Sequence, residues 1–569
     1  MATGDNSREG IFQVLLAVSA AVVLLWGATA IKGADAMCFP QPIQSMRTAA
    51  AGSHSLYMLW ESDTYTIDST GSHEGNHSLY FKKSSDSGKT FSDTIILYRS
   101  GSVCSLYPHM AIGRSGDGRT GQDGIYIMWN DGDKVAFRAS NDSGSTFSDK
   151  VILGQGTLGV IGIPSPLIDG GRIAADGSNG LYVVWNFEQD NNRSDILFRK
   201  STDGGRSFSD PINLSVSNSD RESLNPVISI SSHNNIYVSW SYDPWCSLRL
   251  YSEGIGGNAG KASCEAKIQF ARSTDGGVTF SNPVTLASGS YPTNGMTPID
   301  PNIASAGANV YVTWIVGRNS PSNELAFAKS NDNGSTFSEP LYVIKEYSPD
   351  TNLRMSSFPS MTVFDNDTIY VAWSMVDNDN GTDNLNLMKS IDGGRHFTKI
   401  TSAIPTGFLL AERISHQLAI TRNGTLYFSW PQRSEEKQTT TAILFEAVQE
   451  NKTSALTSVP YQIYSTSINA QNYTESFESL VAADDNHDNG SVYVVWINSS
   501  SPVAESSVLS TLQILLRPST DGGNTFGPVT MVQDVVASGL VPEFASAAVF
   551  MIAALITGAI IASSRLGSK

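Results

Sequence analysis

The sequence predicts an all-β protein, a β-propeller of about eight four-stranded blades, with an apolar segment at each end of the chain. A strand-like segment with Tyr three residues before Trp occurs eight times. A turn-forming motif, Ser-x-Asp-x-Gly, occurs seven times in step with it. The chain also holds 49 glycines and only 16% charged residues, which favours many turns over long solvated helices.

The tryptophan segments predict one central strand in each repeat. Their aliphatic, Tyr, Val and Trp residues favour strands, and apolar side chains at successive positions indicate a strand covered on both faces. Neighbouring tryptophans are 55 to 74 residues apart, enough chain for four short antiparallel strands. The tryptophans are Trp60, Trp129, Trp185, Trp240, Trp314, Trp373, Trp430 and Trp496. Seven or six blades remain the alternatives, since the first unit and the Trp430 unit could be incomplete.

The second repeated motif predicts a tight hairpin between the third and fourth strands. Its Asp can accept hydrogen bonds from backbone N–H groups of its own turn, and its Gly tolerates positive φ. A Phe five residues after the Asp is expected to pack the hairpin onto the blade. The seven aspartates are Asp86, Asp142, Asp203, Asp275, Asp332, Asp392 and Asp521, and the Trp430 unit lacks a copy.

Seven copies of Ser-x-Asp-x-Gly-x-Thr-Phe-like sequence resemble the Asp-box repeat of the sialidase superfamily. The resemblance spans about 450 residues. It implies that these aspartates are structural and lie at the blade periphery, away from any catalytic centre. It also implies a family in which three arginines hold a substrate carboxylate beside a Tyr–Glu nucleophile pair and an acid/base Asp.

Candidate axial residues lie where one repeat passes into the next, just before the Pro-led strand expected to open each blade. Arginine occurs at three of these junctions and could bind a carboxylate in a bidentate fork. The Arg-Ile-Pro signature of sialidases is missing, and no Tyr–Glu pair can be matched. The alternative is that these side chains pair with one another on a solvated rim. The candidates are Arg221, Glu222, Asp300, Arg354, Glu412 and Arg413.

Two further features suggest a disulfide and a cation site. Cys246 and Cys264 bracket a Gly-rich insertion and could form a disulfide that closes it; unpaired thiols are the alternative. Asp377, Asp379 and Asp485 lie in oxygen-rich loops that could bind calcium, although neither loop continues to the Glu of an EF-hand, and ordinary polar hairpins are the alternative. No other cofactor is expected.

Both ends of the chain are predicted to be targeting segments. Residues 1–36 read as a signal peptide, or as an N-terminal anchor if uncleaved, and the propeller is expected over 41–534. A linker at 535–544 leads to an apolar transmembrane helix at 545–563 and a basic cytoplasmic tail at 564–569. The linker's Pro-Glu-Phe, followed by this helix and tail, resembles the PEF-type sorting tails of archaeal surface proteins, although Ala follows the motif in place of the commoner Gly.

Charge and location narrow the expected function. The formal net charge of −17 disfavours nucleic acid, whose phosphates need basic residues. We therefore expect a monomeric, surface-anchored binding or scaffold propeller for glycans or envelope polymers. An exo-acting glycoside hydrolase of the sialidase type is the alternative.

Overall fold

The computed structural model describes most of the chain between Ser45 and Val536. The described residues are 45–51, 54–67, 73–100, 106–114, 122–158, 171–177, 179–189, 193–215, 222–231, 234–243, 264–291, 297–317, 324–343, 353–355, 359–365, 367–377, 382–400, 404–405, 418–421, 424–433, 440–448, 460–467, 472–484, 490–502 and 511–536.

These residues form eight antiparallel sheets of strands consecutive in the chain, the blades of a β-propeller. Sheets 1 to 4 comprise β1 (Ser45–Ala51), β2 (Ser55–Ile67), β3 (His73–Ser84) and β4 (Ile95–Ser100); β5 (His109–Arg114), β6 (Asp123–Asp131), β7 (Lys134–Ser140) and β8 (Val151–Gln155); β9 (Gly171–Ala175), β10 (Leu181–Gln189), β11 (Arg193–Ser201) and β12 (Ile212–Asn213); and β13 (Ser223–Ile230), β14 (Ile236–Tyr242), β15 (Cys264–Ser273) and β16 (Val284–Tyr291).

Sheets 5 to 8 continue the pattern. They comprise β17 (Thr297–Ala306), β18 (Asn309–Gly317), β19 (Glu324–Ser330) and β20 (Leu341–Tyr342); β21 (Leu353–Met355), β22 (Ser360–Phe364), β23 (Thr368–Asp377), β24 (Thr382–Ser390), β25 (Thr398–Lys399) and β26 (Ile404–Pro405); β27 (Ala419–Ile420), β28 (Leu426–Arg433), β29 (Thr440–Val448) and β30 (Tyr461–Ser467); and β31 (Asn472–Ala483), β32 (Val492–Pro502), β33 (Thr511–Ser519) and β34 (Thr530–Val536). Sheet 6 has six strands because its first and fourth strands are each divided into two short pieces.

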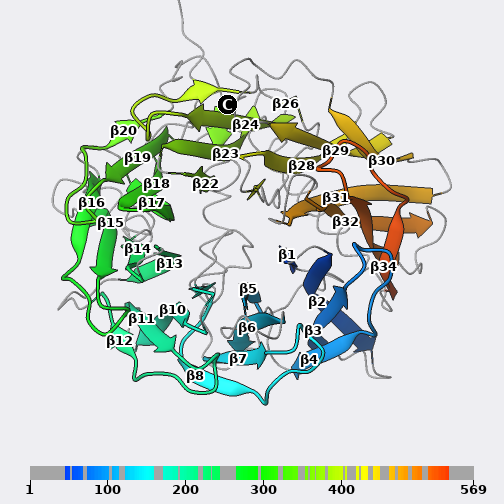
Figure 1. Ribbon diagram of the computed structural model, residues 1–569, viewed down its shortest axis with the longest axis horizontal. Helices are drawn as coiled ribbons and strands as arrows, with labels where there is room; N and C mark the ends of the chain where they lie inside the picture. The colour runs from blue at the N-terminus through cyan, green and yellow to red at the C-terminus, as the bar shows by residue number, and fades with distance from the viewer. Residues whose placement is uncertain are drawn as a thin grey trace, which may run out of the picture. The chain divides into compact units, whose positions relative to one another are not determined.

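The chain divides into two compact units. Unit 1 is Met1–Phe39, Val103–Asp379 and Met388–Thr398, and unit 2 is Pro40–Ser102, Asn380–Leu387 and Lys399–Lys569. Sheets 2 to 5 and part of sheet 6 belong to unit 1, whereas sheets 1, 7 and 8 belong to unit 2. Within unit 1, the first strand of one sheet lies beside the first strand of the next, as β13 and β17 do (Figure 1).

Within each unit, the repeated tryptophan packs against the neighbouring sheet that precedes its own. In unit 1, Trp185 packs with Val135 and Phe137 of sheet 2, and its indole N–H donates to the Gln155 carbonyl oxygen at 2.9 Å. Trp240 packs in the same way with Phe198 of sheet 3. Burying one such side chain stabilises the fold by about 4–6 kcal/mol at about 25 cal/mol per Å². The period of the tryptophans is thus the period of the inter-sheet cores.

In unit 2, the first and last sheets of the chain pack against each other. Trp60 and Met46 share a core with Ile514 and Val532. The ammonium group of Lys82 donates to the Val532 carbonyl oxygen at 2.8 Å, a contact across 450 residues of sequence. No strand is exchanged between these two sheets, because each consists of four consecutive strands. Side-chain packing therefore joins them.

The seven Ser-x-Asp-x-Gly motifs form nearly identical turns between the third and fourth strands. In sheet 4, Asp275 Oδ1 accepts from the Ser273 hydroxyl at 2.7 Å and from the Thr279 N–H at 2.9 Å. The Thr279 hydroxyl donates to the other carboxylate oxygen at 2.6 Å. The Gly277 N–H donates to the Ser273 hydroxyl oxygen at 2.8 Å. One carboxylate and one hydroxyl therefore hold the turn from Ser273 to Thr279, whose N–H groups have no helix or strand partner.

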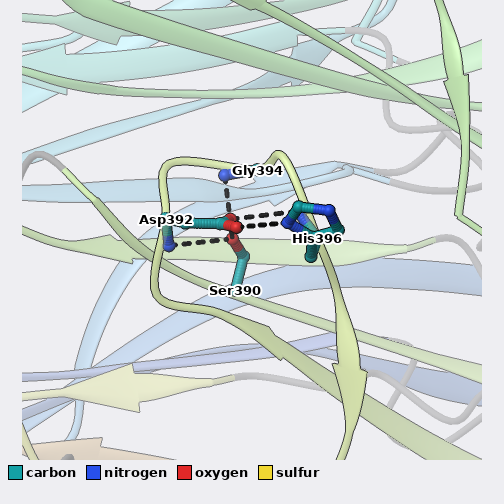
Figure 2. Close-up of polar contacts among 4 residues, drawn as sticks. All are labelled: Ser390, Asp392, Gly394 and His396. Atoms are coloured by element: carbon teal, nitrogen blue, oxygen red, sulfur yellow. Dashed lines mark hydrogen bonds and ion pairs between the residues drawn. The ribbon is translucent and has the colours of Figure 1, made fainter.

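Sheet 6 keeps this turn although a histidine replaces the hydroxyl residue. Nδ1 of His396 lies 2.6 Å from Oδ2 of Asp392, and the His396 N–H donates to Oδ1 at 2.9 Å (Figure 2). Partial burial by itself raises the pKa of Asp392, but the hydrogen bonds from His396 and Ser390 outweigh it and lower that pKa to about 2. The carboxylate thus stays ionised and holds its turn across the neutral pH range.

The phenylalanines of several Asp turns also contact the sheet that precedes theirs in the chain. Phe208, Phe280 and Phe337 meet phenylalanines of the preceding sheet edge-to-face, with ring centroids 4.7 to 5.1 Å apart. In unit 2, Phe526 meets Phe445 in the same way at 4.9 Å. The expectation that this Phe packs onto its own blade is therefore incomplete, because the ring reaches the neighbouring blade.

The predicted all-β fold, the eight blades and the strand character of the Tyr-Trp segments are confirmed. The last strand extends to Val536, two residues beyond the expected end of the propeller. The expected signal segment, PEF motif, transmembrane helix and basic tail lie outside the described residues. In the part of the chain that is described, no helix is long and apolar enough to cross a membrane.

Two adjacent glycines in the turn of sheet 4 allow the effect of backbone strain on stability to be measured apart from the effect of inter-sheet packing. Both have positive φ, 68° at Gly276 and 76° at Gly277. A Cβ on Gly276 would meet no atom within 4 Å, whereas one on Gly277 would lie 2.8 Å from Cζ of Phe198 in sheet 3. We predict that Gly277→Ala lowers the free energy of unfolding more than Gly276→Ala does, by about 1–3 kcal/mol. Urea denaturation of both variants measures the difference, and equal losses would contradict the packing role.

Candidate functional site

In the sheets that carry an Asp turn, the two ends hold different turns and strand ends. The Asp turns share an end with the turn between the first and second strands, to which several of them are hydrogen-bonded. The Asn333 N–H donates to the Ala308 carbonyl oxygen at 2.9 Å, and the Gly204 N–H to the Asn179 carbonyl oxygen at 3.0 Å. The opposite end holds the starts of the first strands and the ends of the second strands, where the axial candidates fall.

Two consecutive sheets of unit 1 carry the same bulge at that opposite end. In β13, Asn225 and Pro226 together face Trp240, and in β17, Asp300 and Pro301 together face Trp314. A proline cannot donate to the strand ladder, so it is accommodated where the register shifts. The first strands therefore begin before their prolines, at Ser223 and Thr297, and not after them as the sequence suggested.

The residue before each proline has an unusual backbone conformation. Asn225 has φ of 57° and Asp300 has φ of 54°. Asn and Asp tolerate this region better than other non-glycine residues, and a residue before proline is normally extended. Strained backbone of this kind concentrates at functional sites.

Asp300 is held between the two sheets by its neighbours. Nδ2 of Asn225 donates to Oδ1 of Asp300 at 2.7 Å. The Asp300 N–H donates to the Ser241 hydroxyl oxygen at 3.0 Å. Asn225 is 7% exposed and Ser241 is fully buried, whereas Asp300 keeps part of its surface exposed. Asp300 is thus anchored through both its backbone N–H and its carboxyl, and part of the residue remains exposed.

The surroundings keep this carboxyl neutral over a wide pH range. Burial raises the pKa of Asp300 from 3.8 to about 7, against the opposing hydrogen bond from Asn225. Although Asp300 is partly exposed, the protein atoms packed around its carboxyl outweigh the one amide that favours its charged form. Near neutral pH it can therefore both donate and accept a hydrogen bond.

The structure places two of the six axial candidates. Glu222 precedes β13, and its carbonyl oxygen accepts from the Asp243 N–H at 2.7 Å, so it lies at the same end of sheet 4 as Asp300. Arg354 lies in β21, with its side chain outside the described set. Arg221, Glu412 and Arg413 also lie outside it, so the arginine cluster remains a hypothesis.

The disulfide and calcium hypotheses likewise fall on residues without described side chains. Cys264 begins β15 and Asp377 ends β23, whereas Cys246, Asp379 and Asp485 lie outside the described residues. Within the described ranges, no group of three or more His, Cys, Asp or Glu side chains could hold a metal ion.

Sequence reasoning missed Asn225 and Ser241 as partners of Asp300. Asn225-Pro226 and Asp300-Pro301 precede their tryptophans by nearly the same distance, which was a signal that they are equivalent. Ser241 directly follows Trp240, but its role depends on the neighbouring sheet and has no local signature.

Comparison with known proteins gives only distant likenesses. No protein-family model and no curated protein matches the chain. Among solved structures, it is similar to an ulvan lyase of a polysaccharide-lyase family, at 12% identity and a TM-score of 0.41, over 87% of this chain and 92% of that one. A Penicillium chrysogenum α-L-arabinanase is 12% identical at a TM-score of 0.35, over 58% and 89% of the two chains. A leech intramolecular trans-sialidase is 12% identical at a TM-score of 0.30, over 88% and 92%. These likenesses assign no activity to this chain.

The raised pKa of Asp300 predicts a stability difference that grows with pH. Well below its unfolded pKa of 3.8 the carboxyl is protonated in both the folded and unfolded states, and at pH 4 the difference between them is still small. Between pH 4 and 7 the unfolded chain ionises while the folded carboxyl stays neutral, so folding loses free energy as pH rises. Asn cannot ionise and tolerates the same φ. Asp300→Asn should therefore match the wild type at pH 4 and be more stable at pH 8 by about 2 kcal/mol, roughly half the full value of such a shift because the group is partly exposed.

Urea denaturation of both proteins at the two pH values provides the measurement. A stability difference that is the same at pH 4 and pH 8 would show that Asp300 is not held neutral by the fold.

Proposed function

We propose that this propeller is a binding or scaffold module for glycans or other envelope polymers, displayed at the cell surface through its C-terminal apolar segment. The observation that carries the proposal is the partly exposed Asp300, which Asn225 and Ser241 hold between sheets 4 and 5 and whose raised pKa leaves part of the carboxyl population protonated at neutral pH. Sugar hydroxyl groups donate and accept hydrogen bonds at once, and a neutral carboxyl does the same. Asp300 lies in β17, and its partners Asn225 and Ser241 lie in β13 and β14. A site built on strands has a more fixed geometry than one built on a loop.

Binding is favoured over hydrolysis because neither the Arg-Ile-Pro signature of sialidases nor a Tyr–Glu nucleophile pair can be matched in the sequence. Glycoside hydrolases of most families need two carboxyl groups on opposite sides of the scissile bond. The acidic chain also suits a neutral polyol better than a polyanion, since its formal net charge is −17.

An exo-acting glycoside hydrolase of the sialidase type is the second candidate. The specific feature in its favour is the same carboxyl, because a pKa of about 7 suits a general acid at neutral pH. In that case a nucleophile and the anion-binding arginines would have to come from segments such as the one holding Arg354.

A glycan array combined with fluorogenic glycosides distinguishes the two candidates. We predict that the purified protein binds a subset of glycans without turnover, and that Asp300→Gly, which accepts the same positive φ, weakens binding at least about tenfold by removing a hydrogen-bonding group. The control is Asp275→Asn, which changes an aspartate in the turn at the opposite end of sheet 4 and should leave affinity unchanged. Turnover that Asp300→Gly abolishes would instead establish the hydrolase, and binding indifferent to Asp300 would contradict this site.

A further inference from the structure

Asn225 has features that its part in the strand does not require. Its backbone is left-handed directly before Pro226, at a bulge in β13. Its Nδ2 reaches across to Oδ1 of Asp300 in the next sheet at 2.7 Å. Its own Oδ1 is buried and has no hydrogen-bond partner. A buried acceptor without a partner costs about 1–3 kcal/mol, and an apolar residue would avoid that cost.

The orientation of the amide explains why this cost is tolerated. Turning the amide over would bring two oxygens together whenever Asp300 is ionised, whereas the amide N–H can donate to Oδ1 in either protonation state. The N–H therefore must point at the carboxyl, and the orphaned oxygen is the consequence. A side chain kept in such an arrangement fixes one carboxylate oxygen and leaves the other, Oδ2, for a ligand or a proton.

We infer that Asn225 is the positioning residue for Asp300: it fixes the carboxyl so that Oδ2 alone is presented to a hydroxyl-bearing ligand. The ligand class in this inference rests on the proposed function. The contact between Asn225 and Asp300 depends only on the two bulged strands, β13 and β17. Ser241 completes the arrangement by holding the Asp300 backbone N–H, so the residue is anchored through both its main chain and its side chain.

Among the described residues, no charged neighbour takes over this role, since burial and the Asn225 amide are the influences on the pKa of Asp300 that arise there. The titratable side chains on the described strands packed against β17 do not contribute to the shift; they are Tyr237, Tyr242, Glu265, Lys267, Arg272 and Tyr311. A substitution of Asn225 should therefore act directly on the pKa of Asp300.

The test uses Asn225→Gly, since glycine accepts the same positive φ and removes only the amide. Without this donor to the charged form, the pKa of Asp300 should rise by about one unit. Carbon-13 NMR titration of the carboxyl measures it, with the resonance assigned by its loss in Asp300→Asn. Glycan affinity at pH 7 should fall about tenfold. The matched control is Asn302→Ala, which removes an amide donated to the Pro359 carbonyl oxygen at 3.3 Å and should leave the pKa of Asp300 unchanged.

The two readouts separate the inference from the proposed function. An unchanged Asp300 pKa in Asn225→Gly, or an equal rise in Asn302→Ala, would overturn the positioning role even if glycans bind. A raised pKa with no glycan bound by the wild type would support the positioning and remove the proposed ligand. Asn225→Asp offers a second check, because a carboxyl so close to Asp300 should raise the apparent pKa of the pair further.

Discussion

A contact between the phenylalanine of an Asp turn and a phenylalanine of the preceding sheet recurs in both units, at Phe208, Phe280, Phe337, Phe397 and Phe526. In unit 1, Phe280 meets Phe198, and Phe397 meets Phe327. The turn can press on its neighbour only because Asp and Ser side chains replace the missing backbone hydrogen bonds and a glycine leaves room at the contact. The tryptophan cores lie deeper between the same sheets. The hydrogen bonds of the turn and the packing between sheets therefore depend on each other, and both recur with the period of the sequence.

This coupling explains why so much of the fold could be predicted from the sequence. The Tyr-Trp strand and the Asp turn are local patterns with local causes, strand propensity and turn hydrogen bonding, and each is repeated enough to exclude chance. The boundary of the first strand was harder. Proline suggested a strand start, but the bulges at Asn225-Pro226 and Asp300-Pro301 let the strand run through it. A register shift depends on the partner strand, which a local pattern does not reveal.

The candidate site could be predicted only in part, for the same reason. Asp300 was found because it stands beside a junction proline. Its partners Asn225 and Ser241 come from the neighbouring sheet, and the raised pKa comes from burial between the sheets. The same side chain gives opposite results at the turn of sheet 4 and at the bulge of sheet 5. Asp275 accepts several hydrogen bonds and its pKa is lowered, whereas Asp300 accepts one and its pKa is raised. The carboxylate at the turn stabilises the fold, and the one at the bulge is the group to which we propose that a ligand binds.

A double-mutant cycle on Phe198 and Phe280 tests the central claim most directly. Their ring centroids are 4.7 Å apart at an interplanar angle of 65°. Unfolding free energies of Phe198→Leu, Phe280→Leu and the double variant give the coupling between a turn and the sheet before it. The account predicts a favourable coupling of about 0.5–1.5 kcal/mol. Strictly additive losses would mean that the turns do not hold neighbouring sheets together.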